Sequence, residues 1–231
     1  MSTAKSGDRL IYLPLGGAGE IGMNAYVYGY GKPGAERLIV VDLGVTFPDM
    51  DGTPGVDLIL PDIAWLEARR EQIEAIFITH AHEDHVGAVG HLWDRLRAPI
   101  HARKFTANIA RGKLDEYGLP ASALTVAEVW PATVTAGPFT VGFLPVSHSI
   151  PECSSLVIDT PAGRVIHSGD FKIDLTPVVG DPFDRALWDS VAKPGVRALV
   201  CDSTNVFSLM PGRSEATLGG DITALFKSAT G

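Results

Sequence analysis

Three histidines and two acidic residues fall within six positions of this chain, in the segment HAHEDH at 80–85. In an extended segment, side chains two positions apart point the same way, so His80 and His82 can bind one cation. Asp84 and His85 follow at the expected turn into a helix, where they would face a second cation. A solvated loop without metal is the plainer interpretation, but it leaves this density of ligands unexplained. The segment therefore predicts a metal centre.

Two residues further along the chain are candidates to complete that centre. A pair of cations needs more than four ligands, because each cation takes four or five and a carboxylate commonly joins the two. His148 follows an expected strand that ends at Pro145, and Asp170 follows the next expected hairpin. Alone, each would more often be a surface or capping residue. Because loops at strand ends commonly build sites, both are expected to be ligands here.

Composition narrows the class of protein. The 231 residues are 45% hydrophobic and 20% charged, which is typical of a globular domain. No apolar run approaches the 18 residues of a membrane span, so no membrane partner is expected. The net charge of −8 argues against a passive nucleic-acid coat with a basic face, although bound cations could reverse the charge locally. The two cysteines lack CxxC spacing, which favours a reducing cytoplasm over a disulfide framework.

Short apolar runs separated by Gly and Pro predict a mixed α/β fold rather than a helical bundle. Strands are expected at 10–15, 25–30, 38–43, 75–79, 124–129, 139–145, 154–160, 164–167 and 198–201. Helices are expected at 62–70, 87–96, 104–117, 184–192 and 214–229, the first of them capped by Asp62. Two sheets covered by outer helices, an αββα sandwich, fit this order best.

The motifs resemble those of the metallo-β-lactamase superfamily, of which the chain matches the first four of five, at Asp42, 80–85, His148 and Asp170. Within it, the chain is similar to the β-CASP nucleases and, among these, to the bacterial ribonuclease J family. The resemblance covers nearly the whole chain. It rests on phrases that include LPLGGAGEIGMN (13–24), THAHEDHVGAVGHLW (79–93), SHSIPE (147–152), HSGDFKID (167–174) and VCDSTN (200–205).

The resemblance implies a role for each candidate. One cation would take His80, His82 and His148, the other would take Asp84 and His85, and Asp170 would bridge both. Asp42 would accept a hydrogen bond near the 80–85 loop and fix a ligand tautomer, although an Asp that merely ends a strand would look the same. Asp202 matches the first β-CASP motif, an acidic residue that orients a general-acid histidine. Zinc is the first expectation for both cations and manganese the alternative.

The function implied is hydrolysis of RNA phosphodiesters by a metal-bound hydroxide, as a 5′-to-3′ exonuclease and an endonuclease, with Asp84, Asp170 and Asp202 as catalytic carboxylates. RNA would be the partner, and the full-length enzyme a homo-oligomer. The family's fifth motif is a histidine, and no histidine follows His167. We therefore expect a fragment with weak activity or none: a lactamase domain at 1–212 and the start of a β-CASP domain at 213–231.

Other interpretations stay open at this point. A stand-alone hydrolase that acts on a thioester or a lactone would use the same ligands without a second domain. A fragment that folds but does not catalyse is the third possibility. Phe47, in a long loop near the expected site, could stack on a base, although loop packing explains it equally simply.

Overall fold

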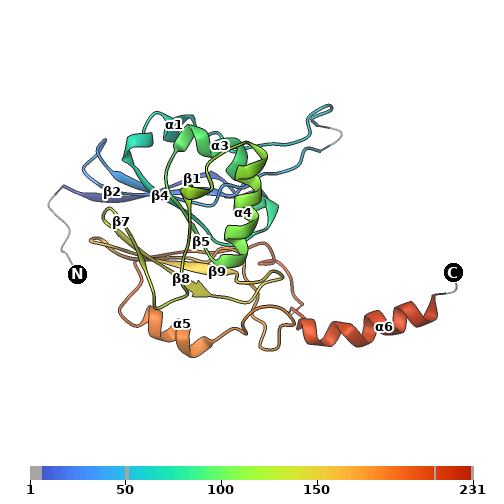
Figure 1. Ribbon diagram of the computed structural model, residues 1–231. Coiled ribbons are helices and arrows are strands. Elements are labelled where there is room, and N and C mark those ends of the chain that lie inside the picture. The colour runs from blue at the N-terminus through green and yellow to red at the C-terminus, as the bar shows by residue number, and fades with distance from the viewer. Residues whose placement is uncertain (1–6, 50–51, 211, 230–231) are drawn as a thin grey trace.

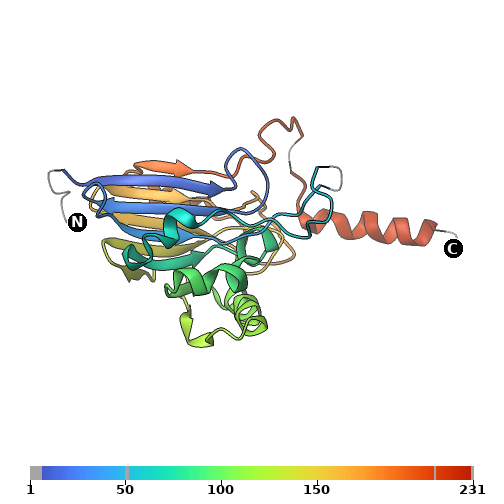
Figure 2. The same ribbon diagram turned by 90° about the horizontal axis from the view of Figure 1, so that it is seen from above.

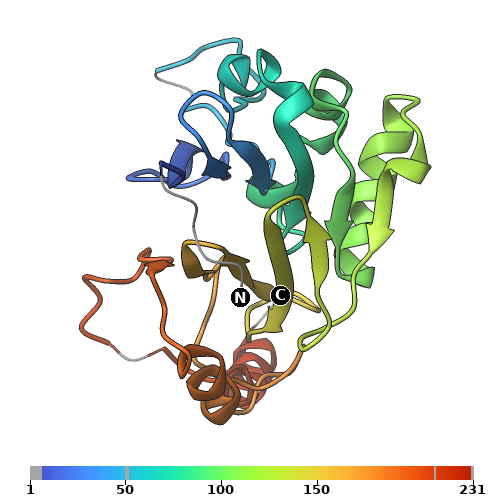
Figure 3. The ribbon, with the colours of Figure 1, turned by 90° about the vertical axis from the view of Figure 1, so that its left-hand side faces the viewer.

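The computed structural model describes residues 7–49, 52–210 and 212–229. Two β-sheets lie face to face, and helices cover their outer faces (Figures 1 and 3). The expected αββα sandwich is confirmed. Among the described residues, no helix has the length and apolarity needed to cross a membrane.

The first sheet has the order β1-β2-β3-β4-β5-β6, so its strands follow one another as they do in the sequence. Its first three strands form an antiparallel meander, and the later strands are parallel, each joined to the next by helical segments. The strands are β1 (Arg9–Gly16), β2 (Ala25–Gly31), β3 (Arg37–Val41), β4 (Ile73–Ile78), β5 (Ile100–Ala102) and β6 (Leu124–Val126). Because β3 and β4 are parallel, the segments that follow them, 42–46 and 79–85, leave the sheet at the same edge.

The second sheet has the order β11-β10-β9-β8-β7. Antiparallel pairing joins all its neighbours except β10 and β11, which are parallel. The strands are β7 (Val134–Ala136), β8 (Phe139–Pro145), β9 (Ser154–Thr160), β10 (Gly163–His167) and β11 (Ala198–Val200).

Helices complete the outer layers. The α-helices are α1 (Ala64–Glu67), α2 (Glu83–Val86), α3 (Val89–Leu96), α4 (Lys104–Glu116), α5 (Arg185–Ala192) and α6 (Leu218–Ser228), and the 3₁₀ turns are η1 (Arg70–Gln72), η2 (Ala121–Ala123) and η3 (Glu215–Thr217). Leu66 of α1, Leu92 of α3 and Leu114 of α4 pack against the first sheet. Val191 of α5 packs against the second sheet.

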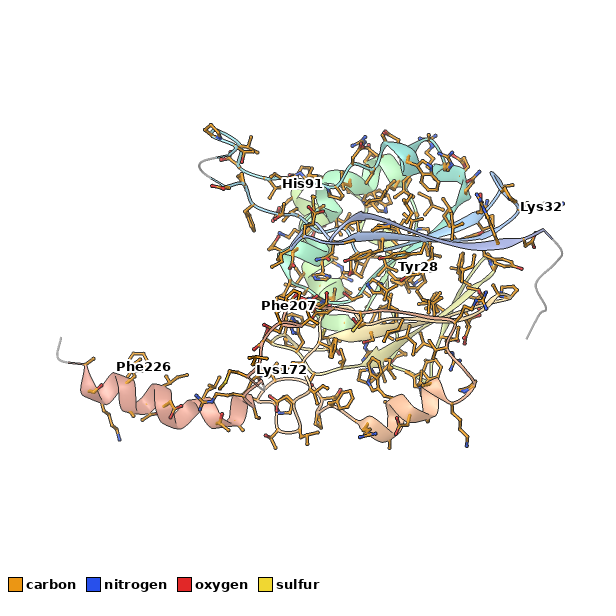
Figure 4. The ribbon with its side chains drawn as sticks, turned by 180° about the vertical axis from the view of Figure 1, so that it is seen from behind. Tyr28, Lys32, His91, Lys172, Phe207 and Phe226 are labelled. Carbon is orange, nitrogen blue, oxygen red and sulfur yellow. The ribbon has the colours of Figure 1, made fainter. Side chains whose placement is uncertain are left out.

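The period of two along the strands builds two separate cores on the first sheet. In β3, Leu38 and Val40 face the helices, whereas Ile39 and Val41 face the other sheet. Tyr28 is 1% exposed and lies between the two sheets (Figure 4). Because these strands are buried on both faces, their sequences are nearly continuous apolar runs.

The structure differs from the expected elements in several places. The strand expected at 124–129 ends at Val126, and the helix expected at 214–229 is η3 followed by α6. The helix expected at 62–70 is one short turn, α1, followed by η1, and Asp62 accepts a hydrogen bond from Ala64 N at 2.9 Å just outside it. The tight η1 turn leads directly into Ile73, the first residue of β4. Strands β5 and β7, of three residues each, are absent from the expected strands.

The last helix, α6, projects away from the sandwich (Figures 1 and 2). No residue of α6 is buried, and Phe226 on it is 77% exposed (Figure 4). The expected domain ranges, 1–212 and 213–231, include positions 1–6, 50–51, 211 and 230–231, which lie outside the described residues.

Candidate metal centre

The candidate ligands come from loops that leave three strands at one end of the sandwich. His80 and His82 follow β4, His148 follows β8, and Asp170 follows β10. The structure brings the ligand atoms of these four residues to within 4.8 Å of one another. A second group, Asp84, His85 and Asp170, meets the same limit. All six ligands expected from the sequence therefore gather in two groups that share one residue.

The first group is built from imidazole nitrogens. Nδ1 of His82 lies 3.1 Å from Nε2 of His80 and 3.2 Å from Nε2 of His148. Oδ2 of Asp170 lies 4.0 Å from Nε2 of His80 and 3.8 Å from Nε2 of His148. Three nitrogens and one carboxylate oxygen that converge in this way match the donor set and ligand number of a tetrahedral zinc site.

The second group lies on the other side of Asp170. Oδ1 of Asp170 is 3.3 Å from Nε2 of His85, and Oδ2 of Asp84 is 3.6 Å from the same nitrogen. The two oxygens of Asp170 thus face different groups. A carboxylate with one oxygen toward each set of ligands has the arrangement needed to bridge two cations.

Asp42 lies behind the two groups and contacts residues of both segments that carry them, Thr79 and His85. It is fully buried, and it has a positive φ of 62°, which Asp tolerates better than most residues. Its carboxylate accepts hydrogen bonds from Thr79 N at 2.7 Å, from the Thr79 hydroxyl at 2.9 Å and from His85 Nδ1 at 2.8 Å. Asp42 is therefore more than a residue that ends a strand.

These contacts decide which nitrogen of each buried histidine is free. Because the Thr79 hydroxyl donates to Asp42, its oxygen can only accept from Nδ1 of His80, 3.0 Å away. Nε2 of His80 is then left with a lone pair that points into the first group. His85 donates from Nδ1 to Asp42, which leaves Nε2 directed at the second group. Such hydrogen bonds typically orient metal-binding histidines.

The pKa values of the histidines differ sharply between the two groups. Burial lowers the pKa of His80 well below 6.5, and the neighbouring imidazoles lower it further. Burial also lowers the pKa of His148, against the opposing charge of Asp170. Burial lowers the pKa of His85 too, but Asp42 and Asp170 outweigh it and raise that pKa to about 10. His80 and His148 thus offer neutral nitrogens, whereas His85 must lose a proton to act as a ligand.

The backbone around Asp84 is fitted tightly against the loop after β3. Leu43 N donates to His85 O at 2.9 Å, and Val45 N donates to Glu83 O at 3.1 Å. Between them, a Cβ on Gly44 would lie only 1.6 Å from the carbonyl oxygen of Asp84. Gly44 is therefore required for the close approach that places the second group.

The loop that carries His148 is fixed from the helical side. Glu152 has a positive φ of 56°. Its Oε2 accepts a hydrogen bond at 2.5 Å from Phe105 N, in the first turn of α4. Its Oε1 lies 3.6 Å from Nη2 of Arg103. Val146 N donates to Cys153 O at 3.2 Å across the base of the loop. The loop is closed at its base and anchored to a helix in the other layer.

A cavity of about 480 Å³ opens beside the second group. Its walls come from the glycine-rich segment after β1 and from the loops after β10 and β11, and they include Asp84, Asp170, Asp202 and Phe207. Asp202 Oδ1 accepts a hydrogen bond from Thr204 N at 2.8 Å. Phe207 is 94% exposed at the rim (Figure 4). Phe47 is also exposed, but it is not among the residues that line this cavity.

Sequence reasoning did not single out Thr79, Asn24 or Glu152. Their types and positions carry no motif of their own, and each acts through a contact with a distant segment. Asn24 is the last residue of the phrase LPLGGAGEIGMN and was given no role of its own, although its side chain reaches Asp84, 60 residues away.

Comparison with known proteins places this geometry in a family. The family model described as metallo-beta-lactamase superfamily matches residues 18–202, which hold both groups of ligands. The chain belongs to the metallo-beta-lactamase superfamily. Among curated members, it is 45% identical over 225 residues to "Ribonuclease J" of Sinorhizobium meliloti, an alignment that covers 97% of this chain and 40% of the relative. It is 41% identical over 216 residues to "Ribonuclease J" of Corynebacterium glutamicum, covering 93% of this chain and 29% of the relative.

This chain thus spans less than half the length of these two relatives. A solved structure, a protein of unknown function from Enterococcus faecalis, is similar with a TM-score of 0.58 and 17% identity, covering 94% of this chain and 57% of that one. Identity this low bears on the fold alone.

Proposed function

We propose that this chain is the N-terminal, metal-binding portion of a ribonuclease of the ribonuclease J type, which hydrolyses RNA phosphodiester bonds with two divalent cations. The observation that supports this most is Asp170, with Oδ2 toward His80 and His148 and Oδ1 toward His85. Paired cations are common in nucleases and phosphatases. The names of the ribonuclease J relatives point to RNA as the substrate class.

The ligands divide between the two cations. His80, His82 and His148 would hold the first cation, Asp84 and His85 the second, and Asp170 would bridge them. Zinc suits the first group because three imidazoles dominate it, and manganese is the alternative. The second group has fewer nitrogen donors, and His85 carries a proton that must leave. The first cation should therefore bind more tightly than the second.

When bound, the cations would act as Lewis acids and lower the pKa of a water molecule. The residues of the chain supply the frame for that chemistry. Asp42 holds His80, through Thr79, and His85 with Nε2 directed inward. Asp84 and Asp170 bring negative charge that moderates the cations, and they are the proposed catalytic carboxylates. Both line the cavity where a scissile phosphate would sit.

Two further residues have proposed roles that depend on a longer chain or on substrate. Asp202 lines the cavity, and its motif assigns it to orienting a general-acid histidine. Phe47 would stack on a base of the RNA. As an exposed loop residue, it is free to do so.

The proposal extends to the setting of the enzyme. Residues 1–212 would form the lactamase domain, and 213–231 would begin a β-CASP domain, which the match at 18–202 and the exposed helix α6 support. We further propose that the complete enzyme is a cytoplasmic homo-oligomer.

Single-turnover cleavage of a 5′-labelled single-stranded RNA by excess protein tests the function. We expect slow cleavage that needs zinc or manganese, stops on chelation and disappears in Asp170→Ala. Thioester and lactone substrates, assayed in parallel, should not be turned over. Turnover of either one without RNA cleavage would contradict the proposal in favour of a stand-alone hydrolase, and inertness toward all three would favour a non-catalytic fragment.

A further inference from the structure

The side chain of Asn24 points at the second group of ligands. Asn24 is 8% exposed and lies just before β2. Its Nδ2 is 3.0 Å from the carbonyl oxygen of Asp84, 3.3 Å from Oδ2 of Asp84 and 3.0 Å from Nε2 of His85. One amide group therefore contacts both ligands that belong only to the second group.

The orientation of this amide is fixed by its neighbours. The backbone carbonyl of Asp84 can only accept a hydrogen bond, so the amide nitrogen of Asn24 must face it. On the other side, the Tyr26 hydroxyl donates to Oδ1 of Asn24 at 2.7 Å, and Tyr26 is itself buried. A flipped amide would lose the bond to the Asp84 carbonyl, because two oxygens would then face each other.

The backbone of Asn24 is held independently of its side chain. Asn24 N donates to Asp84 O at 2.9 Å, and Gly44 N donates to Asn24 O at 2.9 Å. These bonds survive any substitution of the side chain, because they use main-chain atoms alone. Loss of the amide would thus leave the local chain path in place and remove only the contacts to the ligands.

We propose that Asn24 is a positioning residue for the second cation, an inference that rests on the two-cation centre proposed above. One amide hydrogen binds the carbonyl of Asp84, and the other is available to the Asp84 carboxylate. This pairing fixes the carboxylate on the side of Asp170. With Nε2 of His85 engaged by a cation, the amide keeps its bonds to Asp84.

The effect of Asn24 should be confined to one cation. Within the described residues, the polar contacts of its side chain reach Asp84, His85 and Tyr26, and none reaches His80, His82 or His148. Hydrogen-bond partners of metal ligands typically change metal affinity by about 10- to 100-fold. Asn24 should therefore set the affinity for the second cation and leave the first unchanged.

Zinc titration of the 231-residue chain against a competing chelator, with elemental analysis for stoichiometry, tests the proposal. Asn24→Leu keeps the approximate volume of the side chain and removes the amide. We expect it to weaken the second equivalent by about 10- to 100-fold and to change the first by less than about threefold. Tyr26→Phe, a milder change, should weaken the second equivalent by about three- to tenfold. Asn108→Leu, on the exposed face of α4, is the matched control and should change neither.

The outcomes separate this inference from the proposed function. An unchanged second equivalent in both Asn24→Leu and Tyr26→Phe would overturn the role of Asn24 and leave the two-cation centre standing. Equal weakening of both equivalents would also overturn it, because that result indicates a general loss of structure. A wild-type chain that holds a single equivalent would overturn both the two-cation centre and this inference.

Discussion

Asp42 and Asp170 have different roles at the candidate centre. Asp42 is fully buried, and its carboxylate accepts three hydrogen bonds. Asp170 is partly exposed and faces the two groups of ligands. Burial raises the pKa of Asp170, but the hydrogen bond and charge of His85, together with His148 and His82, outweigh burial. The net effect is a pKa below the usual value for Asp. Asp170 is therefore ionised at neutral pH and can join the two groups, whereas Asp42 orients their ligands.

Replacing Asp170 with Ala should remove function and spare the fold. Its side chain leaves a loop after β10 and belongs to no apolar core, so its loss costs little packing. Melting temperatures of metal-free mutant and wild type should agree to within about 4 °C. Metal-dependent RNA cleavage should disappear, and the mutant should retain less zinc after dialysis than the wild type. Retention of two equivalents by the mutant would show that Asp170 is not the bridge.

Binding of the two cations should depend differently on pH. His80 and His148 have lowered pKa values, so they are already neutral above pH 7. His85, with a pKa raised to about 10, must release a proton on binding, so the affinity for the second cation should rise by up to about tenfold per pH unit from 7 to 9. Zinc titrations at three pH values, corrected for the chelator, measure both slopes. A second slope no steeper than the first would contradict this assignment.

The same shift has a consequence for the metal-free fold. A folded pKa above the unfolded value of about 6.5 means that the protonated His85 stabilises the fold, fully so below pH 6.5. That contribution is lost as the pH rises toward 10.

At the scale of elements, the order of strands and the ligand loops could be predicted, but the tethers between them could not. The apolar runs of β2, β3 and β4 are long enough to show, and the ligands follow strands whose ends are visible in the sequence. β5 and β7 have three residues each and pair with β4 and β8, contacts that their own sequences do not record. Asn24 and Glu152 reach segments 60 and 47 residues away, and no local pattern records such contacts.

The close approach at Gly44 gives a test at this scale. Gly44→Ala would place a methyl group 1.6 Å from the Asp84 carbonyl, so the α2 segment must move. We expect a loss of about 2 kcal/mol or more of unfolding free energy, measured by urea denaturation, together with weaker binding of the second cation. Gly112→Ala is the control. It meets open space within α4 and should stabilise the chain by about 0.5–1 kcal/mol.

At the scale of the whole molecule, the sandwich brings three ligand loops from two sheets to one end. His80 and His82 come from the first sheet, and His148 and Asp170 from the second, so neither sheet alone holds a complete first group. The core between the sheets, which includes Tyr28, Phe77 and Phe143, sets the distance between them. Stability of that core and assembly of the centre are therefore linked, which is why a motif only six residues long depends on the fold around it.

Anomalous scattering at the zinc absorption edge, from a crystal of the chain grown with zinc, tests the central claim most directly. The account predicts two peaks about 3.5–4 Å apart. One should lie about 2.0–2.2 Å from His80 Nε2, His82 Nδ1 and His148 Nε2, and the other beside Asp84 and His85, with the Asp170 carboxylate between them. A single peak, or peaks bound by other residues, would contradict it.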